Sequence, residues 1–279
     1  MTAEDQDFAA HAPPPPARWK VRLVRLVARA TPAAVRRRAL TVRHRRKRAR
    51  RHAAERRGDF SLSRPALYGM ADRLDRYLDA GPGFFVEAGA NDGYDQSNTY
   101  HLERQHGWTG LLVEAVPELC ALAAAERPRS RVVNCALVAS GEEGTEVLVR
   151  YGGLRSVVAG THGSEANDRA WVEPAFDLGL EDAYSVTVPA RTLSSLLDEM
   201  QAPEVDLLSL DVEGYEPQVL AGLDLERHAP RLALIEVMDD EARERVEAAL
   251  GERYVAVERL SPFDVLYARA DQPAASTRS

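Results

Sequence analysis

Acidic side chains end four short apolar runs of the sequence, and each run has the length and composition of a buried strand. These acids are Glu87, Glu114, Asp211 and Glu236. Because the carboxyl ends of parallel strands lie along one edge of a sheet, we expect the four carboxylates to converge on a single acidic pocket. Such a pocket suits a cationic ligand such as a sulfonium, and its oxygen atoms could also hold a hard divalent ion.

The stretch FFVEAGANDG at residues 84–93 passes directly from the first apolar run into a turn with two glycines. Gly89 and Gly93 allow the backbone to approach a bound group closely. The spacing differs from the Gly-x-Gly-x-x-Gly of pyrophosphate-binding folds, and Glu87 before the turn would repel a phosphate and attract an ammonium group. These features favour S-adenosylmethionine, which has an amino group, a sulfonium and a ribose diol but no phosphate.

Glu114 follows the second apolar run, 21 residues beyond Gly93. In adenosine-binding βαβ units, a carboxylate about 20 residues after the glycine turn accepts hydrogen bonds from the ribose hydroxyls. Glu114 is therefore a predicted ribose ligand, and Asn134 at the end of the third expected strand is a further cofactor-binding candidate. A glutamate here suits NAD equally well, so a nicotinamide-dependent oxidoreductase stays open, although the absent Gly-x-Gly-x-x-Gly counts against it.

Candidates for a catalytic base or a metal ligand lie near the last two acids. Asp211 and Glu213 stand together in VDLLSLDVEG, and His162 in GTHGSE is a rival base, although an exposed loop histidine is the commoner reading of such a position. Asp239 and Asp240 follow the fourth acid and could complete a Mg²⁺ site with Asp211. The sequence therefore predicts proton transfer, with or without a metal ion, at this end of the pocket.

The elements that must position these side chains alternate between strands and helices. This alternation predicts an α/β fold with a doubly wound, mainly parallel sheet that ends in an antiparallel pair. Strands are expected at 84–86, 110–114, 131–138, 184–190, 205–210, 231–237, 254–258 and 264–268, and helices at 64–80, 97–106, 117–127, 193–200, 215–221 and 241–250. Residues 152–183 have no clear periodicity, which is typical of a lid or a binding loop.

The composition, 45% hydrophobic and 28% charged over 279 residues, is that of an ordinary soluble protein. No apolar run reaches the roughly 18–20 residues of a membrane span, and the acidic, proline-rich start does not resemble a signal peptide. We therefore expect a cytoplasmic protein. Two cysteines are too few for a disulfide framework or a four-thiolate zinc site.

Charge is divided sharply along the chain. Residues 1–57 hold 17 Arg or Lys and 4 Asp or Glu, whereas residues 58–279 hold 19 and 39. We expect a basic leader at 1–57, with disorder over 1–17 and an amphipathic helix at 18–30, then a folded domain at 58–271 and a disordered tail at 272–279. The leader could contact an anionic membrane surface or nucleic acid, or it could be a solvated segment that screens the acidic domain.

Two pairs of stretches resemble the FkbM family of S-adenosylmethionine-dependent methyltransferases: VEAGANDG with LVEAVPE, and TLSSLLDE with VDLLSLDVEGYEPQVLAG. The resemblance covers residues 84–268. It implies a class I, Rossmann-like methyltransferase fold with a seven-stranded sheet, and O-methylation of a hydroxyl on a small-molecule or glycan acceptor, such as a sugar or a natural-product intermediate. The cofactor contacts that it implies are at Glu87, Gly89, Asn91, Gly93 and Glu114. The family usually has Asp where this chain has Glu87.

Two further functions stay open at this point. The basic leader would also suit a methyltransferase or binder directed to nucleic acid, although no Asn-Pro-Pro-Tyr type of motif follows the fourth strand. A methyltransferase fold that serves only as a binding scaffold is a second alternative, and the four acids at strand ends count against it.

Overall fold

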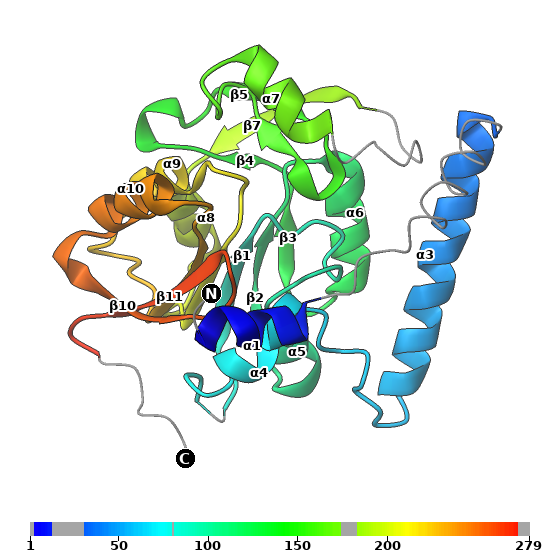
Figure 1. Ribbon diagram of the computed structural model, residues 1–279, viewed down its shortest axis with the longest axis horizontal. Helices are drawn as coiled ribbons and strands as arrows, with labels where there is room; N and C mark the ends of the chain where they lie inside the picture. Colours follow the sequence, from blue (N-terminus) through cyan, green and yellow to red (C-terminus); the bar gives the residue numbers. More distant parts are fainter. Residues whose placement is uncertain (1–2, 13–30, 80, 174–182, 273–279) are drawn as a thin grey trace.

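The computed structural model describes residues 3–12, 31–79, 81–173 and 183–272. A seven-stranded sheet forms the centre of the described part of the chain (Figure 1). In spatial order its strands are β10 (Tyr254–Arg259), β11 (Asp264–Arg269), β9 (Leu232–Glu236), β8 (Leu207–Leu210), β1 (Phe84–Ala88), β2 (Thr109–Val113) and β3 (Arg131–Val133). β11 is antiparallel to both of its neighbours, and the other pairs are parallel. The predicted fold class is confirmed.

The direction in which the chain adds strands reverses between β1 and β8. β2 and β3 follow on one side of β1, whereas β8 and β9 follow on the other. Glu87 of β1 lies level with Ser209 of β8, so the two strands end together. In open α/β sheets such a switch point leaves a crevice outside the carboxyl ends of the strands, and ligands bind there.

Helices cover both faces of this sheet, because side chains alternate between the faces along each strand. Phe84 and Val86 pack on one face with α8, α9 and α10, and Phe85 packs on the other face with α4 and α5. The helices are α4 (Met70–Leu74), α5 (Tyr100–Gln105), α6 (Pro117–Glu126), α8 (Leu193–Met200), α9 (Glu216–Ala221) and α10 (Asp240–Leu250), with short 3₁₀ turns η1 (Leu67–Gly69) and η5 (Gly251–Arg253).

A second, four-stranded sheet lies at the upper end of the body in Figure 1, together with α7 (Glu165–Val172). Its order is β4 (Ala136–Leu137), β7 (Ser185–Arg191), β5 (Glu146–Arg150) and β6 (Val157–Val158), with 3₁₀ turns η2 (Ser140–Glu142) and η3 (Gly153–Arg155) between them. The single strand expected at 131–138 is therefore wrong: it divides at Asn134 into β3 of the main sheet and β4 of the second sheet.

The basic N-terminal part contains two described helices, α1 (Ala3–His11) and α3 (Ala33–Glu55). Disorder was expected over 1–17, but Phe8 of α1 is buried between the guanidinium groups of Arg73 and Arg259, and Asp7 pairs with Arg73. The helix expected at 18–30 lies outside the described residues. Among the helices that are described, none combines the length and the apolarity that a bilayer crossing requires.

The last two turns of α3 are packed against the domain beside α6. Glu126 at the end of α6 forms ion pairs with Arg48 and Arg51, and its Oε1 lies 2.8 Å from the Nε2 of His52. Arg51 is only 5% exposed. Packing on the domain therefore begins within α3, several residues before the boundary expected after Arg57.

Candidate active site

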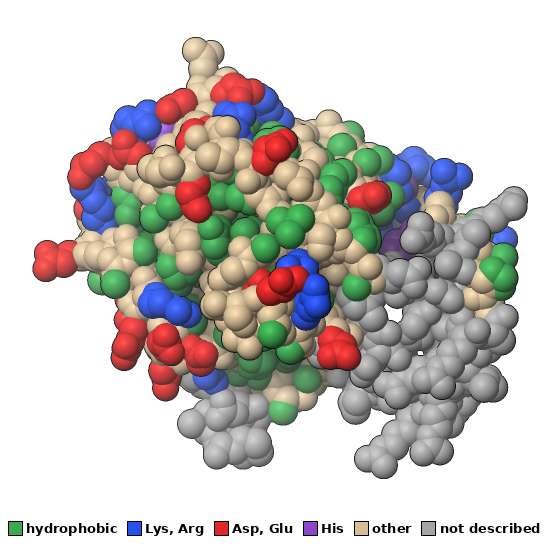
Figure 2. Space-filling view, turned by 90° about the horizontal axis from the view of Figure 1, so that it is seen from above, with side chains coloured by type: hydrophobic (Ala, Val, Ile, Leu, Met, Phe, Trp, Pro, Cys, Tyr) green, Lys and Arg blue, Asp and Glu red, His purple; other side chains and the backbone are tan. Residues whose placement is uncertain are grey.

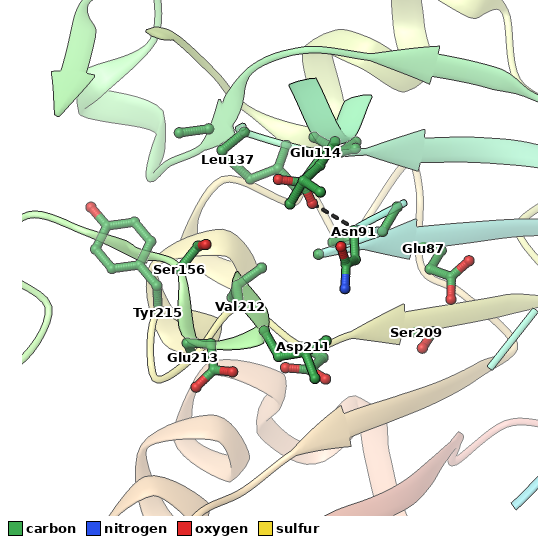
Figure 3. Close-up of a pocket in the computed structure, with 18 of the residues that line it drawn as sticks. Glu87, Asn91, Glu114, Leu137, Ser156, Ser209, Asp211, Val212, Glu213 and Tyr215 are labelled. Carbon is green, nitrogen blue, oxygen red and sulfur yellow. Dashed lines mark hydrogen bonds between the residues drawn. The ribbon is translucent and has the colours of Figure 1, made fainter. Parts of the chain in front are cut away.

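A pocket lies at the switch point between β1 and β8, beneath the second sheet (Figure 3). All four predicted strand-end acids, Glu87, Glu114, Asp211 and Glu236, line it, so their expected convergence is confirmed. Residues from β5, β6 and η3 of the second sheet complete the wall. Among the described residues that line the pocket there is no Arg, Lys or His.

The glycine turn after β1 is pressed against the turn after β8. Gly89 has φ +83°, and a Cβ added there would lie 1.7 Å from the carbonyl oxygen of Asp211. Its amide and that of Ala90 both donate to the carbonyl of Val113, at 3.1 Å. Glycine at position 89 thus allows the turn after β1 to approach the turn after β8 closely. Through these contacts the ends of β1, β2 and β8 are held together at the mouth of the crevice.

Glu114 is held at the pocket wall by backbone amides. Its Oε2 accepts from the amide of Asn91, which has the left-handed φ of +49°, and its Oε1 accepts from the amide of Val116, both at 2.8 Å. Burial raises the pKa of Glu114 to about 7. A carboxylate has about four acceptor positions, so two hydrogen bonds leave capacity for a diol in the pocket.

Asn134 and Gly93 are not among the described residues that line the pocket. Both lie behind the wall and contact segments that carry lining residues. The Nδ2 of Asn134 donates to the carbonyls of Glu114 and Ala115, at 2.8 and 2.9 Å, which fixes the turn that carries the acid. A Cβ on Gly93 would lie 2.9 Å from the Cα of Ala123, so this glycine allows the loop to touch α6. Their predicted cofactor contacts stay predictions.

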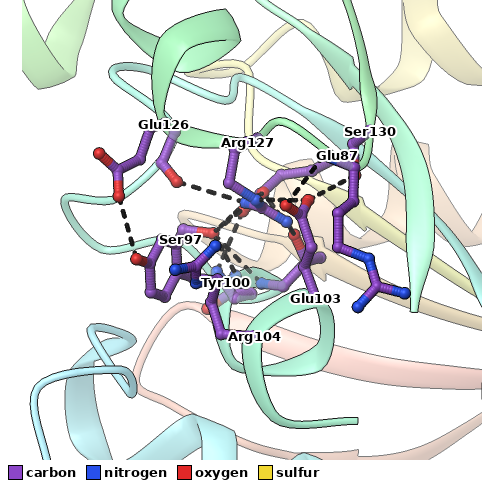
Figure 4. A network of polar contacts seen from close by, with 12 residues as sticks. Glu87, Ser97, Tyr100, Glu103, Arg104, Glu126, Arg127 and Ser130 are labelled. Carbon is purple, nitrogen blue, oxygen red and sulfur yellow. Dashed lines mark hydrogen bonds and ion pairs between the residues drawn. The ribbon is translucent and has the colours of Figure 1, made fainter. Parts of the chain in front are cut away.

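Glu87 is almost fully engaged by protein groups (Figure 4). It accepts from the Oγ of Ser97 at 3.0 Å, the amide of Asn98 at 3.0 Å and the Oγ1 of Thr99 at 2.6 Å, and it pairs with Arg127 at 3.2 Å. Ser97 and Asn98 themselves line the pocket. Glu87 therefore organises the loop that forms one wall of the pocket.

Asp211 and Glu236 form a coupled pair of carboxyl groups. Asp211 opens to solvent through the pocket, yet protein surrounds it on its other sides, and this enclosure together with the charge of Glu213 raises its pKa well above the usual range. Burial, and then the charge of Asp211, raises the pKa of Glu236 strongly. Because the pKa values of both groups are raised, we infer that the pair holds at least one proton at neutral pH.

Glu213 occupies an unusual backbone conformation at φ +59°, directly after this pair. Its Oε2 accepts from the indole Nε1 of Trp171 at 3.1 Å, and burial raises its pKa to about 7. The ring of Trp171 stacks on His162, with centroids 4.6 Å apart, and the guanidinium of Arg155 lies 4.8 Å from the Trp171 ring. A non-glycine residue at positive φ is strained and is often found at a functional site.

His162 stands behind this turn rather than in the pocket wall. Its Nδ1 lies 3.3 Å from Oδ1 of the buried Asp168, and its Nε2 would be 3.6 Å from a Cβ on Gly214. The structure therefore brings His162 next to Glu213 through Trp171, but His162 is not among the described residues that line the pocket.

The predicted Mg²⁺ site is not supported. Asp239 caps α10 by accepting from the amide of Ala242 at 2.7 Å, and Asp240 is the exposed first residue of that helix. Over the described ranges, no group of three or more His, Cys, Asp or Glu side chains is arranged to hold a metal ion. The expectation that Asp211, Asp239 and Asp240 share an ion is corrected accordingly.

Three residues of the site were not found from the sequence: Trp171, Asp168 and Arg127. The first two lie on α7, in the segment that had no clear periodicity. Ser164 before EANDRAWV is a helix-capping signal, and its Oγ does accept from the amide of Asn167 at 3.2 Å. Arg127 carries no local signal, because its two partners are distant in the sequence.

A family model described as "Methyltransferase FkbM domain" matches residues 87–259. No curated protein matches the chain. Among solved structures, a TehB-like SAM-dependent methyltransferase from Corynebacterium glutamicum is 15% identical, with 78% of this chain and 96% of that chain covered and a TM-score of 0.39.

Proposed function

Because the chain belongs to the FkbM methyltransferase family and is an S-adenosylmethionine-dependent methyltransferase, we propose that it methylates a hydroxyl oxygen of a sugar or a natural-product intermediate. The acceptor oxygen gains the methyl group and loses its proton. A base near the transferred methyl group is therefore required. The pocket must also favour S-adenosylmethionine over nucleotides that carry phosphate groups.

The pocket residues fit S-adenosylmethionine. The described wall holds several acids and no Arg or Lys, so it would repel the negative charge of a pyrophosphate, which counts against NAD. Glu114 retains acceptor capacity for a ribose diol, and Val113, Leu119 and Leu137 provide apolar surface close to it for an adenine ring. When bound, S-adenosylmethionine supplies an electrophilic methyl group.

The acids on the other side of the pocket would receive the acceptor and its proton. In Figure 3, Asp211 and Glu213 lie across the pocket from Glu114, with Ser156 and Tyr215 beside them. The raised pKa values of Asp211 and Glu236 mean that this pair already holds a proton at neutral pH, so Asp211 is less available to accept another than a free carboxylate is. Glu213 has a pKa of about 7, close to the value at which a general base is most effective.

The observation that carries the proposal is this Glu213 carboxyl, strained at positive φ and fixed by Trp171. A hydroxyl needs a base when it is methylated. Two lining acids, Glu114 and Glu213, have a pKa of about 7, and Glu213 is the one that lies across the pocket from the proposed ribose site. Trp171 and His162 would then act as positioning residues, since they hold Glu213 and the turn after it without entering the pocket wall.

The test uses the full chain, S-adenosylmethionine with a ¹³C-labelled methyl group, and a panel of hydroxylated sugars, polyketide alcohols and amines. We expect the label to appear as a methyl ether in the nuclear magnetic resonance spectrum. Label found on nitrogen or carbon alone would reject O-methylation.

A variant pair tests the base separately. Glu213→Gln should slow the transfer roughly 100-fold or more, whereas Glu244→Gln, an exposed residue of α10, should leave it unchanged. If ether still forms at the full rate in Glu213→Gln, the hydroxyl acceptor stands and Glu213 is not its base.

A further inference from the structure

Among the described side chains of helix α3, those that contact the domain most closely lie on one face of its last two turns. The residues of that face contact Tyr100, Arg104 and Glu126, and they are Arg48, Arg51, His52 and Glu55. At 100° per residue, another set recurs about half a turn away from them. That set is Val35, Ala39, Val42, Arg46 and Arg50.

The outward face combines exposed apolar residues with cations. Val35 is 54% exposed and Val42 is 41% exposed, and both lie in the part of α3 that precedes the turns packed on the domain. A shallow surface groove runs along them, and its described lining is Val35, Ala39, Val42, Arg43, Arg46, Lys47 and Arg50. Figure 2 shows blue side chains at the upper right of the described surface, on the side of the molecule where α3 lies.

Charge limits what could cover this face. The described lining of the groove holds four cations and no anion, so its partner must be negatively charged. Residues 18–30 of the same chain carry five Arg or Lys and no acid, and like charges would oppose their docking there. The same repulsion opposes pairing of this face with itself in a second copy.

The apolar stripe then distinguishes between anionic partners. Nucleic acid phosphates would engage the cations but would leave Val35 and Val42 without an apolar environment. A lipid surface accepts both, because an amphipathic helix lies in the interface plane with its apolar face at the headgroup–acyl boundary and its cations on the headgroups. Two valines and one alanine bury little area, so the anionic headgroups must supply much of the binding.

We propose that α3 binds the surface of an anionic lipid bilayer through Val35, Ala39 and Val42 and the cations that flank them. The helix lies on the membrane and does not cross it. The other face stays bound to the domain, so the methyltransferase body is held at the membrane.

The test is sedimentation of the full chain with vesicles of phosphatidylcholine alone and with vesicles that also contain phosphatidylserine. We expect binding only to the second kind. Reversal of two cations, Arg46→Glu with Arg50→Glu, should weaken it at least tenfold, since each basic residue near such a surface contributes about fivefold or more. The matched control, Arg169→Glu with Arg245→Glu, makes the same change of charge on exposed residues away from α3 and should bind as the unchanged protein does.

A second variant tests the apolar stripe. Val35→Ser with Val42→Ser should weaken vesicle binding at least about threefold and leave the far-ultraviolet circular dichroism unchanged. Equal binding to both kinds of vesicle, or equal loss in the test and control charge pairs, would overturn the proposal. So would tighter binding to duplex nucleic acid that ignores the serine changes, or self-association that Arg46→Glu with Arg50→Glu abolishes.

Discussion

The guanidinium Nη1 of Arg127 lies 3.2 Å from the Oε2 of Glu87, and the side chains are 0% and 6% exposed. Arg127 also pairs with the fully buried Glu103 at 3.0 Å. One cation therefore balances two carboxylates beneath the loop that forms a wall of the cofactor pocket, and α6 is tied to β1 through it (Figure 4).

Replacement of this cation should be costly. Arg127→Met leaves Glu87 and Glu103 buried without a counter-charge, and we expect the free energy of unfolding to fall by about 3–5 kcal/mol in urea denaturation. Arg131→Met is the control, because the Arg131–Glu199 pair is nearly half exposed and its loss should cost less than about 1 kcal/mol. A similar loss of unfolding free energy in the two variants would show that the buried ion pairs of Arg127 contribute no more to stability than an exposed pair does.

Glu114 should control the affinity for S-adenosylmethionine. Glu114→Gln removes the carboxylate that would receive the ribose hydroxyls in the proposed site, so the dissociation constant should rise about 10- to 100-fold in calorimetric titration of the full chain. Glu118→Gln, an exposed change in the following helix, should leave the constant within about twofold of the parent value, the scatter expected of a surface substitution. An unchanged constant in Glu114→Gln, with the fold intact by circular dichroism, would remove Glu114 from the ribose site.

The rate should depend on pH through Glu213. A base works only when it is unprotonated, and the pKa of Glu213 is about 7, so kcat should fall about tenfold per unit below pH 7 and level off above it. Saturating cofactor is needed, because Glu114 titrates in the same range and would alter binding. In Glu213→Gln the sloping limb should disappear, and a profile that keeps the limb would point to another base.

Two adjacent arginines of α3 provide a matched test of how this helix is held. Arg51 pairs with Glu126 at 2.6 Å and donates to the Oη of Tyr100 at 3.0 Å, whereas Arg50 is exposed on the outward face. Arg51→Met should lower the free energy of unfolding by about 2–3 kcal/mol, and Arg50→Met by less than about 0.5 kcal/mol. Equal losses of unfolding free energy in the two variants would mean that the contacts of Arg51 add nothing to the stability of the domain.

The parts that the sequence predicts well depend on local periodicity. Apolar runs such as Phe84–Val86 and Leu207–Leu210 end in acids, and a parallel sheet necessarily brings such ends to one edge, so the order of elements and the acidic pocket were both predictable. The antiparallel strand pair at the end of the chain was visible for the same reason, since alternation and turn signals are local.

The parts that the sequence does not predict depend on distant polar partners. Nothing near Glu87 indicates that Arg127 will occupy its oxygen atoms, and a glutamate at a strand end looks the same whether it meets a ligand or a buried cation. Asn134 divides an apparently continuous strand because its amide bonds to the carbonyls of Glu114 and Ala115, which belong to another strand end. Likewise, the sequence of α3 shows that the helix is basic, but it does not show which face of the helix packs on the domain.

The close contact between Gly89 and the carbonyl of Asp211 has a consequence for the order of events during synthesis. The glycine turn after β1 is completed against β8, and the acid pair of the pocket needs β9 as well. A nascent chain that has emerged only as far as β3 therefore contains the residues of the glycine turn and Glu114, but the pocket has not yet formed. We expect the cofactor to find no site on the ribosome-bound N-terminal half, so it can stabilise the finished domain but cannot guide the early steps of its folding.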